Sequence, residues 1–140
     1  MTVDTVSVFE HTIEITHTWL YDLMDQFGWQ DKQRAFVALR AVLHALRDRL
    51  SVDDASHLAA QLPMQIREIY YEDCHPAGEP LAERRKSDFL GNVVAECSDE
   101  FRSDGLVTKA VFQVLAKHIS PGACQKIKGA LPQEIRALWT

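Results

Sequence analysis

The sequence predicts an all-α protein of about eight helices, arranged as two pseudo-symmetric four-helix repeats that share one core. Three observations lead to this prediction. The stretches Arg40–Tyr71 and Lys109–Thr140 align at a constant offset of 69 residues without a gap. Apolar residues recur at helical spacing in both stretches, and β-branched residues do not alternate as they would in strands. Helix-capping serines and helix-breaking prolines occupy the same positions in both.

Core and capping positions, and no set of reactive groups, are what the two stretches have in common. Of the 32 aligned pairs, eight are identical: Ala41/Ala110, Val42/Val111, Leu46/Leu115, Ser51/Ser120, Leu62/Leu131, Pro63/Pro132, Ile66/Ile135 and Arg67/Arg136. Two copies are too few for a solenoid. We therefore expect the halves to pack on each other about a pseudo-two-fold axis.

The first two helices of each half are predicted from apolar stripes. The first helices are marked by Trp19, Leu20, Leu23, Met24 and Phe27, and at an offset of 70 by Phe89, Leu90, Val93 and Val94. The second helix of the first half is marked by Phe36, Leu39, Leu43, Leu46 and Leu50, which step by three and four residues. Its counterpart runs through Val111, Phe112, Leu115 and Ile119.

The third and fourth helices are predicted from their starts. Ser51 and Ser120 stand at N-cap positions. Pro63 and Pro132 each begin a further helix, so the preceding helix should end by Leu62 and Leu131. In the fourth helices, Tyr70 and Trp139 are aligned and predicted to be core residues, whereas Tyr71 is the better candidate for a surface role.

Residues 1–140 are predicted to form a single domain, with repeat one over about 8–73, a connector over 74–86 and repeat two over about 87–140. The segment Cys74–Pro80 carries two prolines and a glycine, which is typical of a connector. Arg84, Arg85 and Lys86 follow it, and we interpret this short cationic run as a solvated helix entry in preference to a binding patch.

Composition narrows the classes of partner. The formal net charge of -5 argues against nucleic acid and against an anionic membrane surface. No apolar run approaches the roughly 20 residues that cross a bilayer, and residues 1–12 show no signal-peptide pattern. Three dispersed cysteines, Cys74, Cys97 and Cys124, suggest reduced thiols and a cytoplasmic location.

Several motifs together resemble the bacterial family called domain of unknown function 2267. The motifs are Trp19-Leu20-x-Asp22-Leu23-Met24, Gly28-Trp29-x-Asp31, Ala38–Leu50, Ala59–Pro63 with Ile66–Glu72, His75–Gly78 and Leu131–Trp139. The resemblance covers nearly the whole chain. It implies an all-helical, two-repeat, soluble bacterial protein, and it carries over no activity and no catalytic residues.

Two Glu-x-x-His motifs are the best candidates for chemistry. Glu14/His17 and Glu72/His75 would each place a carboxylate and an imidazole on one helix face, as in di-iron bundle proteins. Such short motifs also arise by chance, and His75 precedes Pro76, where a helix is expected to end. A metal site at Glu14, His17, Glu72 and His75 is therefore the alternative interpretation.

Remaining polar groups give weaker signals. Cys74 and His75 are neighbours, but a nucleophile and its base usually come from distant segments. Tyr71, Cys74 and His75 are retained as candidate binding residues. His44 and His57 align with polar residues, so both are predicted on solvated faces, and His118 near a helix C-terminus is likewise interpreted as structural.

The sequence therefore predicts a non-enzymatic protein-interaction or small-ligand-binding module without a cofactor. Its partner would be an unknown protein or small molecule, and the chain would be a monomer or homodimer. The alternative function is a small metal- or thiol-dependent enzyme that uses the Glu14/His17 and Glu72/His75 pairs.

Overall fold

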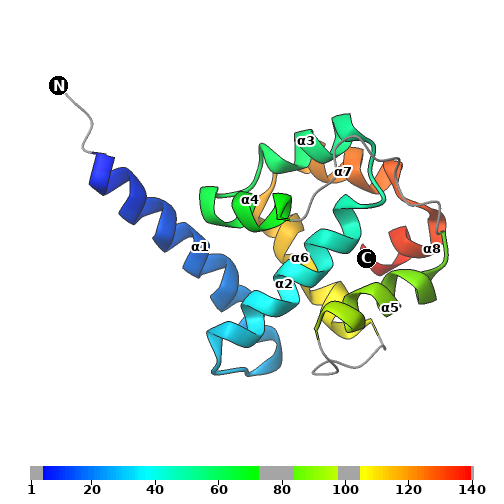
Figure 1. Cartoon of the computed structure of the whole chain (residues 1–140), viewed down its shortest axis with the longest axis horizontal. Helices are drawn as coiled ribbons and strands as arrows, with labels where there is room; N and C mark the ends of the chain where they lie inside the picture. The colour runs from blue at the N-terminus through cyan, green and yellow to red at the C-terminus, as the bar shows by residue number, and fades with distance from the viewer. Residues whose placement is uncertain (1–4, 73–83, 98–104, 140) are drawn as a thin grey trace.

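The prediction of an all-α fold is confirmed by the computed structural model, which describes residues 5–72, 84–97 and 105–139 (Figure 1). These residues form eight α-helices and a short 3-10 helix, and they contain no strand. The bounds are α1 Thr5–Phe27, α2 Lys32–Arg47, α3 Val52–Ala59, α4 Met64–Tyr71, α5 Lys86–Glu96, α6 Leu106–His118, α7 Pro121–Ala130, α8 Gln133–Arg136 and η1 Ala137–Trp139.

The helices of the two halves interleave. α1 packs against α2, α4 and α6, α5 packs against α2 and α8, and α3 lies along α7. Buried side chains from both halves belong to one continuous cluster, so the predicted shared core is present. A helix with one apolar stripe must bury that stripe against a neighbour, and here several of the neighbours belong to the other half.

The predicted capping residues act as expected. Ser51 Oγ accepts a hydrogen bond from the Asp54 amide at 3.2 Å, and Ser120 Oγ accepts one from the Ala123 amide at 3.1 Å. Pro63 and Pro132 stand immediately before α4 and α8. Their extended backbones turn the chain between consecutive helices, and the helices before them end by Ala59 and Ala130.

One arginine in each half secures this turn in the same way. The Arg67 guanidinium donates to the carbonyls of Ala59 and Leu62 at 2.9 and 3.0 Å. Arg136 donates to the aligned carbonyls, those of Lys128 and Leu131, both at 2.9 Å. Because the last carbonyls of a helix lack intrahelical partners, these bonds satisfy acceptors at the ends of α3 and α7. We call each arrangement an arginine clamp.

The large aromatic side chains of the fourth helices are buried, as predicted. Tyr70 donates its hydroxyl proton to the Ala55 carbonyl at 2.8 Å, and Trp139 Nε1 donates to Cys124 Sγ at 3.2 Å. Ala55 and Cys124 are themselves aligned residues. Each aromatic residue thus ties its helix back to the third helix of its own half.

Contacts between the halves also occur in pairs. The His118 ring stacks on Trp19 with 4.8 Å between centroids, and the Arg49 guanidinium lies 4.9 Å from the centroid of Phe89. Arg49 aligns with His118, and Phe89 with Trp19. Such exchanged contacts are what the predicted pseudo-two-fold arrangement requires, although the symmetry itself stays a prediction.

The largest difference between the halves is the length of their first helix. α1 has 23 residues, whereas its counterpart α5 has 11. Figure 1 shows the first turns of α1 projecting away from the other helices. At the other end, α1 stops at Gly28, whose φ of 68° is left-handed, and the Trp29 amide donates to the Met24 carbonyl in the manner of a Schellman cap.

Most of the predicted connector, including Cys74–Pro80, lies outside the described residues. Arg84 and Arg85 precede α5 and are exposed, in line with a solvated helix entry. Among the residues described, no helix has the length and apolar character needed to cross a bilayer.

Ile66 and Ile135 should be equivalent core positions, because both are aligned and fully buried. Truncating either to alanine should lower the free energy of unfolding by about 2–5 kcal/mol, since a cavity forms in a packed core. Urea denaturation of both variants measures the loss. A nearly neutral Ile135→Ala would show that the second half does not share the core in the way the first half does.

Candidate functional site

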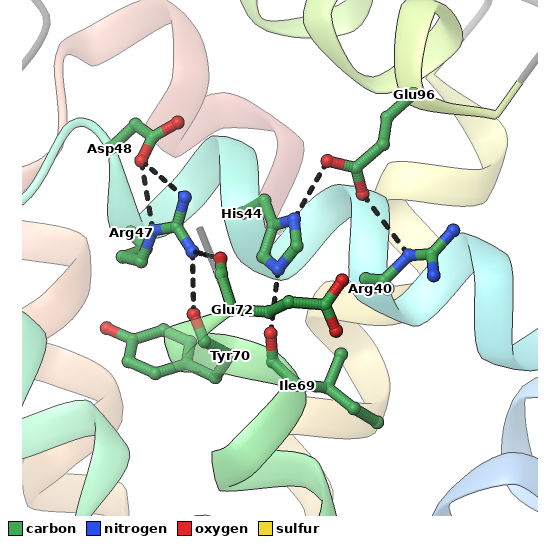
Figure 2. Close-up of polar contacts among 8 residues, drawn as sticks. All are labelled: Arg40, His44, Arg47, Asp48, Ile69, Tyr70, Glu72 and Glu96. Carbon is green, nitrogen blue, oxygen red and sulfur yellow. Dashed lines mark hydrogen bonds and ion pairs between the residues drawn. The ribbon is translucent and has the colours of Figure 1, made fainter. Parts of the chain in front are cut away.

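The most elaborate polar cluster of the described residues surrounds His44 on α2 (Figure 2). The side chain is only 7% exposed, so the prediction that His44 lies on a solvated face is wrong. Its Nε2 donates to the Ile69 carbonyl of α4 at 2.7 Å, and its Nδ1 lies 2.8 Å from Glu96 Oε1 of α5. Alignment with the polar Gln113 could not reveal these partners, because they come from other helices.

Arg47 extends the cluster by one helical turn. Its terminal nitrogen donates to the carbonyls of Tyr70 and Glu72 at 2.8 and 2.7 Å, and the guanidinium also pairs with Asp48 at 2.9 Å. Together with His44, Arg47 therefore satisfies the last carbonyls of α4, where a cation also complements the helix dipole. Glu72 enters the cluster through its backbone oxygen.

Glu96 links the cluster to the second half of the chain. One carboxylate oxygen accepts from His44, and the other lies 3.6 Å from the Arg40 guanidinium. Both neighbours of the His44 ring are hydrogen-bond acceptors. Both bonds therefore exist together only when each ring nitrogen carries a proton, or when the proton between the ring and Glu96 rests on the carboxylate.

This arrangement holds the helices in place and presents no reactive group. Both nitrogens of the His44 ring have partners, and Arg47 is directed at backbone carbonyls. A general base needs a lone pair within reach of a substrate proton, and the His44 ring offers none here. The cluster thus fixes α2, α4 and α5 against one another.

A second polar cluster ties α1 to α6. Asp22 accepts from His118 Nε2 at 2.6 Å and from Lys117 Nζ at 3.1 Å. Burial raises the pKa of the Asp22 carboxyl, but hydrogen bonds and charge from His118 and Lys117 outweigh burial and lower it overall. His118 is thus confirmed in a structural role near the end of its helix.

The residues of the predicted metal site do not come together in the part of the chain described. Glu14 and His17 lie on α1, and His17 packs edge-on against Tyr21. Glu72 follows α4. Within the described residues no group of three or more His, Cys, Asp or Glu side chains could hold a metal ion. His75 is outside those residues, so the four-residue set remains a prediction.

The predicted binding residues are only partly placed. Tyr71 is exposed and meets Tyr70 edge-on with 5.3 Å between ring centroids, which agrees with a surface position. Cys74 and His75 lie outside the described residues. Cys97 is buried in the core, and Cys124 is half-buried and packs against it. Both side chains therefore contribute to packing.

One surface feature was not predicted. A hollow of about 550 Å³ opens between the end of α7 and α8, and it is lined by Arg84, Lys128, Leu131, Pro132, Gln133, Arg136 and Ala137. Three of these side chains are cationic and none is acidic. The sequence did contain a signal for this hollow. Arg84, Lys128 and Ala137 differ in charge from the residues at the aligned positions of the first half, which are Glu14, Ala59 and Glu68.

Comparison with family models matched residues 16–138 to the family described as an uncharacterised conserved protein, DUF2267. The match spans most of the chain, so the protein belongs to this family. A comparison with curated proteins gave no significant match.

Replacing His44 by alanine should destabilise the fold, because the Ile69 carbonyl would lose its buried donor and Glu96 would lose a partner. We expect a loss of about 1–3 kcal/mol in urea denaturation. His57→Ala is the matched control, since His57 is exposed and contacts only Lys126 at 2.7 Å among the interactions described. Its effect should stay within about 0.5 kcal/mol. Equal effects would contradict the structural role of His44.

Asp22 should contribute to stability at neutral pH. Its pKa is lower in the folded state, so the contribution is present above the unfolded pKa and is lost as the pH falls through the folded pKa. Asp22→Asn should therefore be less stable than the natural chain at pH 7, and the difference should shrink in the acid range. Thermal melts from pH 7 to acid measure the gap, and a constant gap would exclude this linkage.

Proposed function

We propose that the protein is a non-enzymatic protein-interaction module, and that the first turns of α1 are its docking element. Exposed apolar side chains on this segment are the observation that carries the proposal. Val6, Phe9 and Ile13 are 60%, 47% and 46% exposed. Val8 and Ile15 on the same segment are exposed as well. Clustered exposed apolar side chains mark interaction sites.

The spacing of these residues favours a helical partner. Val6, Phe9 and Ile13 begin a series that continues through Thr16 to Leu20, Leu23 and Phe27 in steps of three and four. Leu20 and Leu23 are buried against the body of the molecule. The exposed residues thus extend the surface by which α1 already packs on helices, with the spacing of a coiled-coil seam.

The helical turns of α1 before Thr16 have no helical counterpart among the described residues of the second half. α5 begins at Lys86, which corresponds to Thr16 at the offset of 70, so the exposed turns of α1 are additional. The family match also begins at residue 16. An extension that serves the fold would be covered by it, whereas these turns project from it (Figure 1).

A second copy of the chain is the partner that we propose. Two identical helices can pair the same apolar face in an isologous dimer, which is the commonest oligomer. The pair would be weak, because Glu10 and Glu14 flank the stripe and bring like charges together. The three cysteines of the chain are dispersed in sequence, which suits a reducing compartment, and we place the protein in the cytoplasm.

Sedimentation over a range of concentrations tests this proposal on the full chain. We expect a monomer–dimer equilibrium that strengthens with salt, because salt screens the acidic flanks. Phe9→Ser should weaken dimerisation at least about tenfold, since tenfold corresponds to about 1.4 kcal/mol and burying an aromatic side chain contributes more.

Two valine variants provide a matched control. Val6→Ser and Val52→Ser make the same change at sites that are 60% and 54% exposed, but only Val6 lies on the proposed interface. Val6→Ser should weaken the dimer and Val52→Ser should not. A chain that stays monomeric at all concentrations, or equal effects of the two substitutions, would refute self-association through α1.

A further inference from the structure

The hollow between α7 and α8 carries a concentration of positive charge on an acidic protein. Arg84, Lys128 and Arg136 line it, and none of the described residues that line it carries a carboxylate. The whole chain has a formal net charge of -5. A concave cationic surface on such a chain is a local feature of the fold and does not follow from composition.

The first half of the chain supplies an internal comparison. Arg67 and Arg136 form the same clamp, so the backbone around them has the same hydrogen bonds in both halves. Three other aligned positions differ in charge: Arg84 corresponds to Glu14, Lys128 to Ala59 and Ala137 to Glu68. Three cations in the second half thus replace one cation and two carboxylates in the first. The clamp explains Arg67 and Arg136, but it explains neither Arg84 nor Lys128.

We infer that this hollow is a binding site for a small organic phosphate. Arginine and lysine are the side chains that recognise phosphate, the first as a planar fork and the second as a point charge. The clamp uses Nε and one terminal nitrogen of Arg136, which fixes the guanidinium while its other terminal nitrogen takes no part in those two bonds. Three cations complement a doubly charged phosphate group better than they complement a single carboxylate, which carries one charge.

The size and floor of the hollow define the rest of the ligand. About 550 Å³ is far more than a bare phosphate fills and is within the range of small-molecule sites. Leu131, Pro132 and Ala137 give it an apolar surface, and Gln133 adds one neutral polar group. An apolar or planar body attached to the phosphate would lie on that surface. Glu134, which follows Gln133 in the sequence, does not line the hollow and accepts from the Lys86 amide at 3.4 Å.

Titration calorimetry of the full chain at low ionic strength tests the site with phenyl phosphate as the probe. We expect phenyl phosphate to bind at least about tenfold more tightly than inorganic phosphate, because its ring covers the apolar floor. Phenol should not bind measurably. Phthalate tests a dicarboxylate in place of phosphate, and equal or tighter binding of phthalate would overturn the phosphate assignment.

Substitutions at two cations of the hollow test the site, and a second lysine of α7 provides the matched control. Lys128→Ala introduces the residue found at the aligned position of the first half, Ala59. Arg84→Glu likewise introduces the residue aligned with Arg84, Glu14. Each should weaken phenyl phosphate binding at least about tenfold. Lys126→Ala removes the same charge from the same helix outside the hollow and should leave affinity unchanged.

Thermal melts confirm that each variant is folded before its affinity is compared. Equal losses in Lys126→Ala and Lys128→Ala would show a diffuse electrostatic effect and overturn the site. Binding of a short single-stranded DNA provides a second check. The site would also be overturned if this DNA displaced phenyl phosphate and its own affinity fell equally in Lys126→Ala and Lys128→Ala. No binding of phenyl phosphate to the folded natural chain would refute the inference, whether or not α1 mediates dimerisation.

Discussion

The fold depends on the packing of each first helix against the second helix of the other half. α1 packs on α6, and α5 packs on α2, so each half covers an apolar stripe of the other. The paired contacts of Trp19 with His118 and of Phe89 with Arg49 fix both crossings. A half of about 70 residues on its own would leave much of its apolar surface in water. α3 and α7 form a further contact between the halves.

The two halves share a framework and differ in what is attached to it. The caps at Ser51 and Ser120 and the arginine clamps recur with nearly the same hydrogen-bond lengths. Arg47 aligns with Ala116, whose side chain has no donor, so the capping of α4 by Arg47 is not repeated at the aligned position of the second half. Differences between aligned residues are thus where the individual properties of each half arise, because the shared residues are committed to packing and capping.

Two surfaces stand apart from the framework and have opposite chemistry. The start of α1 is apolar and flanked by carboxylates, whereas the hollow beside α8 is cationic. The start of α1 and helix α8 lie on opposite sides of the molecule in Figure 1. Only the hollow falls within the residues matched to the family, which begin at 16. The two proposals therefore concern different parts of the chain, and either surface can be altered without touching the other.

The sequence by itself determined the helices and how they begin. Spacing of three and four residues identified the apolar faces, and Ser51, Ser120, Pro63 and Pro132 marked the helix starts, because these signals act within one or two turns of the chain. Burial of aligned residues such as Ile66 and Ile135 could be predicted for the same reason.

Only the tertiary structure decided which polar side chains meet. His44 was predicted to be solvated and is buried, because its partners Ile69 and Glu96 come from two other helices. Arg84, Lys128 and Arg136 gather at one hollow although 44 residues separate the first two in sequence. Local periodicity specifies which residues share a helix face. It carries no information on which helix will cover that face, and burial and charge clustering depend on that choice.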